Sequence, residues 1–329
     1  MMSRSIFTIS LDFELHWGGF EKWPIDGYKD YFDKTREVIH QVLKAFERTE
    51  VHCSWATVGL LLHQTKKELI SSIPKIKPTY TEHHLSAYKY IEEVGIGENE
   101  KEDPYHFADS LVRQIIDASG QELSSHSFAH FYCNEPGQTL QQFEADAKAW
   151  NRAAEKYGVT AKSLVFPRNQ FNDNYLEVCR NVGIEIVRAN PVDWWWQIDS
   201  TQNESGWKQL NRGLDAYVNL GGKTSFDLSK IDKKKGVWLL PASRLLRPFR
   251  PKELFLNDLK INRIKREMTI AAQNNECYHL WWHPHNFGRY TQQNMSGLVD
   301  ILNHYQELNN EYGMQSLNMG EIVDQLNNA

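Results

Sequence analysis

Short apolar runs rich in β-branched residues alternate along the chain with longer segments in which apolar residues recur every three or four positions. The first run, residues 6–11 (IFTISL), precedes residues 31–48, where Val38, Ile39, Val42 and Phe46 fall at helical spacing. The first pattern predicts a buried strand, and the second predicts a helix with one buried face.

This alternation continues to the end of the chain. Further strands are predicted at residues 51–59, 121–128, 161–167, 184–190, 236–243 and 277–283, and helices at 61–73, 139–158, 172–183, 259–275 and 297–313. Gly158 and Gly183 are placed as helix stops. About seven strand–helix units in series predict the α/β class and an irregular (β/α)7 barrel, although an open parallel sheet gives a similar pattern.

Two long polar stretches interrupt this rhythm. Residues from about 66 to 105 are charged and contain prolines, and residues from about 197 to 235 carry Gly, Ser, Asn and a run of three lysines. We interpret both as insertions over the carboxyl-terminal rim of one barrel domain that spans residues 1–329, because long loops of this kind often form lids or substrate walls.

Composition narrows the functional classes. The net charge of −5 comes without a long basic run, which argues against a nucleic-acid partner. The four cysteines are widely spaced and form no C-x-x-C pair, so we expect buried free thiols. The chain has neither an apolar leader segment nor an 18-residue apolar span. We therefore expect no integral membrane segment and a cytoplasmic location, or one peripheral to a membrane; the oligomeric state is left open.

Polar residues gather where the predicted strands end. In a β/α barrel the carboxyl ends of all strands meet at one rim, where active sites lie. The residues that this rule brings together are Asp12, Glu14, His126, His130, Arg168, Asn169, Asn190, Asp193, Arg244, His283 and His285.

The first and third strands supply the strongest candidates for chemistry. Asp12 and Glu14 share one strand face, and two carboxylates this close repel each other unless they share a cation or a proton. The alternative is that one of them caps the next helix or pairs with a lysine or arginine. His126 and His130 can converge on a metal from one helical turn, or they can be an ordinary surface pair. One carboxylate with two imidazoles suits a catalytic zinc-like ion, and the second carboxylate can act as a base in amide hydrolysis.

Five motifs in order resemble the polysaccharide deacetylases of carbohydrate esterase family 4: SLDFE (10–14), HSFAH (126–130), FPRNQFN (166–172), NPVDWWW (190–196) and LWWHPHNFG (280–288). The resemblance spans nearly the whole chain and implies an irregular barrel of about seven units. It implies that Asp12 is the catalytic base, that Arg168 orients this base, that His126 and His130 bind metal, and that Asp193 tunes the catalytic histidine.

The chain departs from the family pattern in three places. The family has two adjacent aspartates, whereas Phe13 separates the acids here, so the two roles can be exchanged; we assign Glu14 as metal ligand and Asp12 as base. Arg168 follows a proline instead of preceding one, which makes its role less specific. His283 and His285 both fit the last motif, and we favour His283 as the acid because it is closest to the family position.

The resulting hypothesis is a metal-dependent hydrolase that removes an N-acetyl group from an amino sugar. The cofactor is one divalent ion, with zinc favoured and cobalt, manganese or nickel as alternatives. The resemblance is nearest to members associated with bacterial surface-polysaccharide assembly, for which the substrate is a sugar nucleotide, a lipid-linked sugar or a polysaccharide. The rival hypotheses are a hydrolase of another non-peptide C–N bond and a noncatalytic carbohydrate-binding barrel.

Substrate contacts are expected from aromatic and polar residues beside the motifs. Indole rings can stack on a sugar, or they can belong to the core. Arg244 can bind an anionic group of the substrate, or it can form a structural salt bridge. The residues assigned to substrate binding are Trp17, Asn169, Trp194, Arg244, Trp282 and His285.

Overall fold

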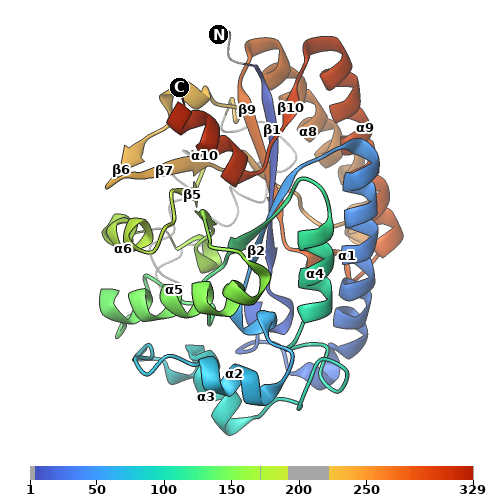
Figure 1. Ribbon diagram of the computed structural model, residues 1–329. Coiled ribbons are helices and arrows are strands. Elements are labelled where there is room, and N and C mark those ends of the chain that lie inside the picture. Colours follow the sequence, from blue (N-terminus) through green and yellow to red (C-terminus); the bar gives the residue numbers. More distant parts are fainter. Residues whose placement is uncertain (1–3, 171, 192–221, 329) are drawn as a thin grey trace.

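A curled sheet of mainly parallel strands forms the centre of the protein, and helices pack around it (Figure 1). The computed structural model describes residues 4–170, 172–191 and 222–328. The strand order is β6-β7-β5-β4-β3-β2-β1-β9-β8, with β10 paired to β1. The strands are β1 (Ile6–Phe13), β2 (Cys53–Thr57), β3 (Gln121–Ser125), β4 (Ser163–Leu164), β5 (Ile186–Ala189), β6 (Lys233–Lys234), β7 (Val237–Pro241), β8 (Arg244–Leu245), β9 (Cys277–Trp282) and β10 (Gln315–Ser316).

One extended segment links the two ends of this sheet. β7 pairs with β5, and β8, which follows after two residues, pairs with β9. Between them the Ala242 N–H donates to the Ala189 carbonyl at 2.9 Å, and the Ser243 N–H donates to the His279 carbonyl at 2.8 Å. The segment stops pairing with β5 where it begins to pair with β9, so the sheet curls round on itself. The predicted irregular α/β barrel is therefore confirmed.

Helices connect the strands and bury one face each. Val38, Ile39, Val42 and Phe46 of α1 are fully buried, as their spacing predicts. A capping box begins α5: the Gln142 N–H donates to the Thr139 hydroxyl, and the Thr139 N–H donates to Oε1 of Gln142. The α-helices in the described residues are α1 (Lys29–Thr49), α2 (Lys66–Ser72), α3 (Ala87–Glu93), α4 (Asp109–Asp117), α5 (Leu140–Ala154), α6 (Leu176–Asn181), α8 (Leu254–Asn274), α9 (Thr291–Tyr312) and α10 (Met319–Asn328).

The two faces of β1 have different surroundings, which decides where its acids point. All eight residues of the strand are buried, and the odd-numbered ones, such as Ile9 and Leu11, belong to the main apolar core. On the opposite face the Ser10 hydroxyl lies 2.8 Å from Nε2 of His279, on β9. Because side chains alternate along a strand, Asp12 shares this polar face with Ser10.

The first predicted insertion packs over the carboxyl ends of β1 and β3. It contains α2 and α3. The Trp17 indole N–H, after β1, donates to the His106 carbonyl at 3.1 Å. The Tyr132 N–H, after β3, donates to the Tyr80 hydroxyl at 2.8 Å. The segment that contains Tyr80 and ends near His106 therefore covers one side of the rim.

The second predicted insertion is described only from residue 222 onward, and residues 222–235 do not lie at the rim. Phe226 forms a bridge with Cys277, at the start of β9, and Leu228 packs in a small core with Ile6, at the start of β1. The physical reason is the crossover: β5 and β7 are parallel, so the chain must return to the amino ends of the strands before β7 begins.

Two expectations from composition can be compared with the structure. All four cysteines are buried and free, as expected. Across the described part of the chain, no helix combines the length and the apolar character that a membrane span requires.

Candidate active site

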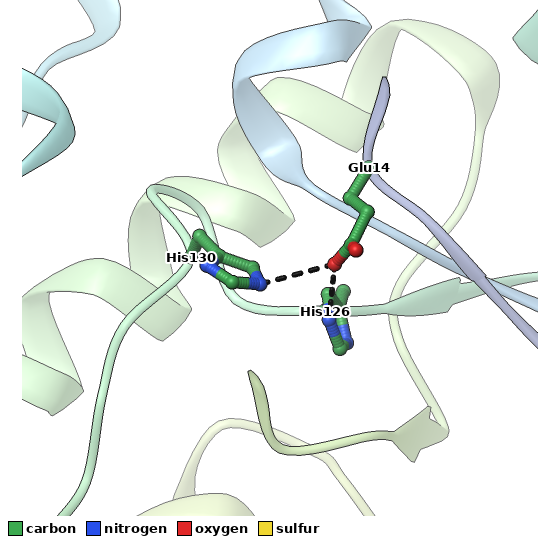
Figure 2. A group of neighbouring side chains, drawn as sticks. All are labelled: Glu14, His126 and His130. Carbon is green, nitrogen blue, oxygen red and sulfur yellow. Dashed lines mark hydrogen bonds and ion pairs between the residues drawn. The ribbon is translucent and has the colours of Figure 1, made fainter. Parts of the chain in front are cut away.

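Three buried side chains from the carboxyl ends of β1 and β3 converge on one point (Figure 2). Glu14 directly follows β1, His126 directly follows β3, and His130 lies four residues further on. Glu14 Oε2 lies 3.2 Å from His126 Nε2 and 3.0 Å from His130 Nε2. One ligand atom of each residue lies within 4.8 Å of the others. A group with this geometry can hold a metal ion.

An irregular loop, and not the expected helical turn, brings the two histidines together. Ser127 and His130 have positive φ angles of 60° and 54°, which non-glycine residues adopt at an energetic cost. The Asp146 carboxyl group, on α5, accepts hydrogen bonds from the backbone N–H groups of Phe128 (2.6 Å) and Ala129 (3.0 Å). Burial outweighs these bonds and raises the pKa of Asp146 to about 7. Asp146 therefore positions the loop, a role that the sequence pattern did not reveal.

The hydrogen bonds of His126 leave the lone pair of its inward nitrogen available for a metal, whereas His130 Nε2 contacts Glu14 Oε2 at 3.0 Å, a contact that a bound ion would replace. His126 Nδ1 lies 2.9 Å from the Val165 carbonyl. Because a carbonyl can only accept, Nδ1 carries the proton and Nε2 is left with its lone pair. This buried Nε2 faces Glu14 without making a hydrogen bond. His130 Nδ1 lies 2.9 Å from the Tyr132 hydroxyl. Such outer contacts are typical of metal-binding histidines, so the donor set fits a divalent ion.

The charge of Glu14 also suits a ligand. Burial raises the pKa of this carboxyl group, but the surrounding histidines, His283, His126 and His130, outweigh burial and hold the pKa well below its ordinary value. Glu14 is therefore ionised across the neutral range, and two neutral imidazoles with one carboxylate form a recognised three-ligand set for catalytic zinc.

The second carboxylate, Asp12 on β1, is held by an arginine that belongs to none of the five sequence motifs. Arg188, on β5, donates from Nη1 to Asp12 Oδ1 at 2.6 Å and from Nη2 to Asp12 Oδ2 at 2.8 Å. It also donates to the Ser10 hydroxyl (3.1 Å) and to Asn169 Oδ1 (2.7 Å). Burial raises the pKa of Asp12, but Arg188 and then His283 lower it below its ordinary value. The base candidate is therefore ionised and fixed in orientation.

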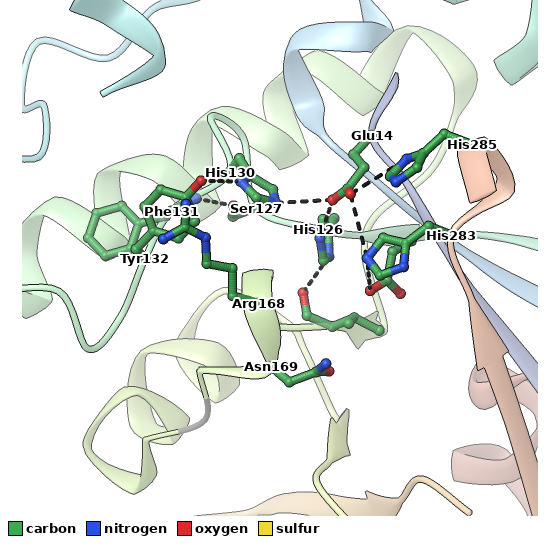
Figure 3. A network of polar contacts seen from close by, with 12 residues as sticks. Glu14, His126, Ser127, His130, Phe131, Tyr132, Arg168, Asn169, His283 and His285 are labelled. Atoms are coloured by element: carbon green, nitrogen blue, oxygen red, sulfur yellow. Dashed lines mark hydrogen bonds and ion pairs between the residues drawn. The ribbon is translucent and has the colours of Figure 1, made fainter. Parts of the chain in front are cut away.

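His283 reaches both carboxylates, and Figure 3 shows its ring beside Glu14. Its Nε2 lies 3.5 Å from Asp12 Oδ2 and 3.6 Å from Glu14 Oε1, and its side chain is 27% exposed. His285 is buried, with Nδ1 3.8 Å from Glu14 Oε1. Burial lowers the pKa of His285 to about 3, so this ring is neutral and cannot give up a proton near pH 7. The geometry favours His283 over His285 as a proton donor.

Arg168 does not contact Asp12, which corrects its expected role. The residue follows Pro167 with a φ of 54°, and its guanidinium pairs with Glu21. Its Cζ lies 4.1 Å from the centre of the Tyr132 ring. Because the Tyr132 hydroxyl contacts His130, Arg168 supports a metal-ligand candidate, while Arg188 takes the place beside Asp12.

Three residues expected to bind substrate point elsewhere. Trp282 is fully buried in the apolar core, because alternation along β9 turns it away from the face that carries Trp281; the Trp281 ring instead lies 4.3 Å from Cζ of Arg188. Trp17 is fully buried against the first insertion. Arg244 is paired with Glu267 of α8 at 2.7 Å, so it is a structural ion pair.

The remaining predicted residues divide into two groups. Asn169 lies in the site, where it accepts a hydrogen bond from Arg188, and His285 lies beside Glu14. Asp193 and Trp194 lie outside the described residues, so their roles stay predictions.

Solved structures of known proteins resemble this fold. A protein from Mycobacterium smegmatis assigned as a polysaccharide deacetylase matches with a TM-score of 0.60 and 12% identity over 99% of this chain and 91% of its own. A protein from Pseudomonas aeruginosa with the same assignment matches with a TM-score of 0.54 and 11% identity over 98% and 90% of the two chains. The chain has the barrel fold of these proteins.

The polysaccharide deacetylase fold is not confined to deacetylases. A 4-α-glucanotransferase from Thermococcus litoralis matches with a TM-score of 0.53 and 12% identity, over 98% of this chain and 40% of its own. No family model matches the sequence, and no curated protein matches it. The fold therefore sets the architecture, and the choice of chemistry depends on the site.

Proposed function

We propose that the chain is a metal-dependent hydrolase that removes an acetyl group from an N-acetylated amino sugar. The observation that carries this proposal is the buried cluster of Glu14, His126 and His130 beside a second carboxylate, Asp12, and a partly exposed histidine, His283. This arrangement supports hydrolysis of an amide better than transfer of a glycosyl group. Glycosyl transfer needs a pair of carboxyl groups but no imidazole ligands.

The chain's own residues divide the work as follows. Glu14, His126 and His130 would hold the ion, which supplies polarisation of the acetamide carbonyl and a lowered pKa for bound water. Asp12, kept ionised by Arg188, accepts the proton of the attacking water. His283, which reaches solvent, donates a proton to the departing amine. The products are acetate and a free amino sugar.

The proposal extends to the metal, the substrate and the location of the protein. We favour zinc because nitrogen and carboxylate ligands in a set of three suit it, with cobalt, manganese and nickel as alternatives. The substrate is a sugar nucleotide, a lipid-linked sugar or a polysaccharide. A cytoplasmic or membrane-peripheral role in surface-polysaccharide assembly remains a prediction that cell fractionation would test.

Metal content is the first test. Protein purified without a histidine tag should contain about one divalent ion per chain by mass spectrometry, and a His126→Ala, His130→Ala double variant should lose it. If neither protein holds metal after incubation with zinc, cobalt or manganese, the hydrolase proposal fails and a noncatalytic sugar-binding barrel replaces it.

Acetate release is the second test. The metal-loaded protein is assayed against N-acetyl sugars, sugar nucleotides and small non-sugar amides. We expect release from the sugars only, and turnover of the non-sugar amides alone would favour a hydrolase of other C–N bonds. Asp12→Asn should abolish turnover while metal stays bound, and unchanged turnover would overturn the assignment of the base.

A further inference from the structure

A cavity adjoins the candidate active site. It has a volume of about 340 Å³ and lies among the segments that follow β1, β8 and β9, which are neighbours in the sheet. His285 separates it from the metal cluster. The His285 ring centre lies 5.5 Å from that of Trp23, which lines the cavity, while His285 Nδ1 lies 3.8 Å from Glu14 Oε1. A ligand in this cavity is therefore one side chain away from the reacting centre.

Aromatic rings form one wall of the cavity. Trp23 and Tyr28 are stacked, with ring centres 5.7 Å apart and planes 23° apart, and Tyr31 packs edge-on against both. All three side chains are partly exposed. The face of an aromatic ring is electron-rich, so it suits the C–H face of a sugar ring better than a purely aliphatic wall would.

Two arginines add positive charge to this wall. Arg289 Cζ lies 5.7 Å from the ring centre of Tyr28 and 5.6 Å from that of Tyr31, and no carboxylate of the described residues pairs with it. Arg250 pairs with Glu253 at 3.3 Å. None of the described residues that line the cavity is acidic. In a chain of net charge −5, this local excess of guanidinium groups favours an anion, which a guanidinium binds through paired hydrogen bonds.

We infer that this cavity is a substrate subsite for a sugar that carries an anionic group, a phosphate or a carboxylate, next to the N-acetyl group that is removed. The inference rests on the proposed function and narrows its substrate class to acidic or phosphorylated amino sugars. The sugar ring packs against the exposed parts of Trp23, Tyr28 and Tyr31, and the anionic group pairs with Arg289 and Arg250.

Binding without turnover tests the subsite independently of catalysis. Glucose 1-phosphate and methyl glucuronide serve as the phosphate and carboxylate probes, and methyl glucoside is the neutral probe, each titrated by calorimetry into the full chain. Arg289→Gln should weaken binding of the preferred anionic probe by about tenfold or more, because a bidentate charged contact is lost. It should change binding of the neutral probe by less than about twofold. The probe that depends more on Arg289 identifies the anionic group.

Arg113→Gln is the matched control, because Arg113 also lies over a tyrosine ring, at 5.4 Å from the centre of Tyr157, but does not line the cavity. Equal binding of charged and neutral probes, or equal losses in the Arg289 and Arg113 variants, would overturn the subsite. Acetate release separates the two proposals. If binding depends on Arg289 but no N-acetyl sugar is turned over, only the deacetylase proposal is refuted. If N-acetylglucosamine 1-phosphate and N-acetylglucosamine are turned over equally well, only the subsite is refuted.

Discussion

Replacing Arg188 with lysine should lower both stability and turnover, because one ammonium group cannot reproduce a fork that holds both oxygens of Asp12. The two bonds measure 2.6 and 2.8 Å, and both side chains are almost completely buried. Removing one partner of such a pair costs about 3–5 kcal/mol. Lysine keeps the charge but loses at least one bond to a charged group, so we expect a loss of about 2–3 kcal/mol in the free energy of unfolding.

Urea denaturation and acetate-release kinetics measure the two effects of Arg188→Lys. Turnover should fall by about 100-fold, because displacement of a catalytic group by about 1 Å has an effect of this size. Arg113→Lys is the control, since the half-exposed side chain of Arg113 pairs with Asp109 of the same helix, α4, and the free energy of unfolding of this variant should change by less than about 0.5 kcal/mol. If Arg188→Lys unfolds at the same urea concentration as the unmodified protein and turns over as fast, the pair with Asp12 does not have the importance inferred here.

Three further changes test the supports of the site and the pH dependence of the fold. Asp146→Ala leaves the backbone N–H groups of Phe128 and Ala129 without their acceptor. It should lower the free energy of unfolding by about 2 kcal/mol or more and weaken zinc binding about 10- to 100-fold. Asp146→Asn should recover part of both losses, measured by urea denaturation and by zinc titration. Gly59→Ala places a Cβ 2.6 Å from Phe128 Cδ2 and 2.8 Å from Phe128 Cα, so urea denaturation should show a loss of about 1–3 kcal/mol, whereas Gly27→Ala, where nothing lies within 4 Å of the new Cβ, should show almost none. A hydrogen bond to Glu321 raises the pKa of His52 above its ordinary 6.5, so this pair stabilises the fold fully below about pH 6.5 and loses its effect as the pH rises through the higher folded-state value. His52→Gln should remove this pH dependence, which amounts to a few tenths of a kcal/mol for a partly exposed pair. Urea denaturation at about pH 5.5 and about pH 8.5 measures it. If the free energy of unfolding differs between the two pH values as much in the variant as in the unmodified protein, the assignment is contradicted.

The sequence predicts most of the fold because its elements have strong periodicity. Apolar residues repeat at helical spacing over 31–48 and 297–313, and the structure has the long helices α1 and α9 there, with α9 ending at Tyr312. The sequence also predicts the strand at residues 277–283, but it does not show which of Trp281 and Trp282 faces the core. Trp282 faces the core and Trp281 faces the site, because the strand begins at Cys277 and alternation then fixes each side chain. A period-two pattern gives two faces, and only the neighbouring strands decide which face is interior.

The sequence predicts that His126 and His130 belong to one candidate site, and the structure brings them together, but in a different backbone conformation from the one expected. Spacing by four residues suggested a helical turn, whereas Ser127 and His130 have positive φ angles. Such angles are uncommon in residues other than glycine. It depends on the two hydrogen bonds to Asp146, which lies on α5, the helix that follows this loop in the same strand–helix unit. The spacing of residues along the chain does not show that a helix side chain accepts hydrogen bonds from the loop before it.

The acidic pair of β1 shows how the site separates two carboxylates into different roles. Asp12 and Glu14 lie on the same side of the strand, where their negative charges repel each other, so each needs positive or hydrogen-bonding partners. Arg188 occupies both oxygens of Asp12 with a permanent charge, whereas Glu14 faces imidazoles that carry no permanent charge. A carboxylate that already has a fixed cation has little need of a metal, while one surrounded by neutral nitrogen ligands is completed by one. The lone arginine in an otherwise apolar strand, IVRA, was the signal for this division, because a charge buried in a strand requires a partner of opposite sign.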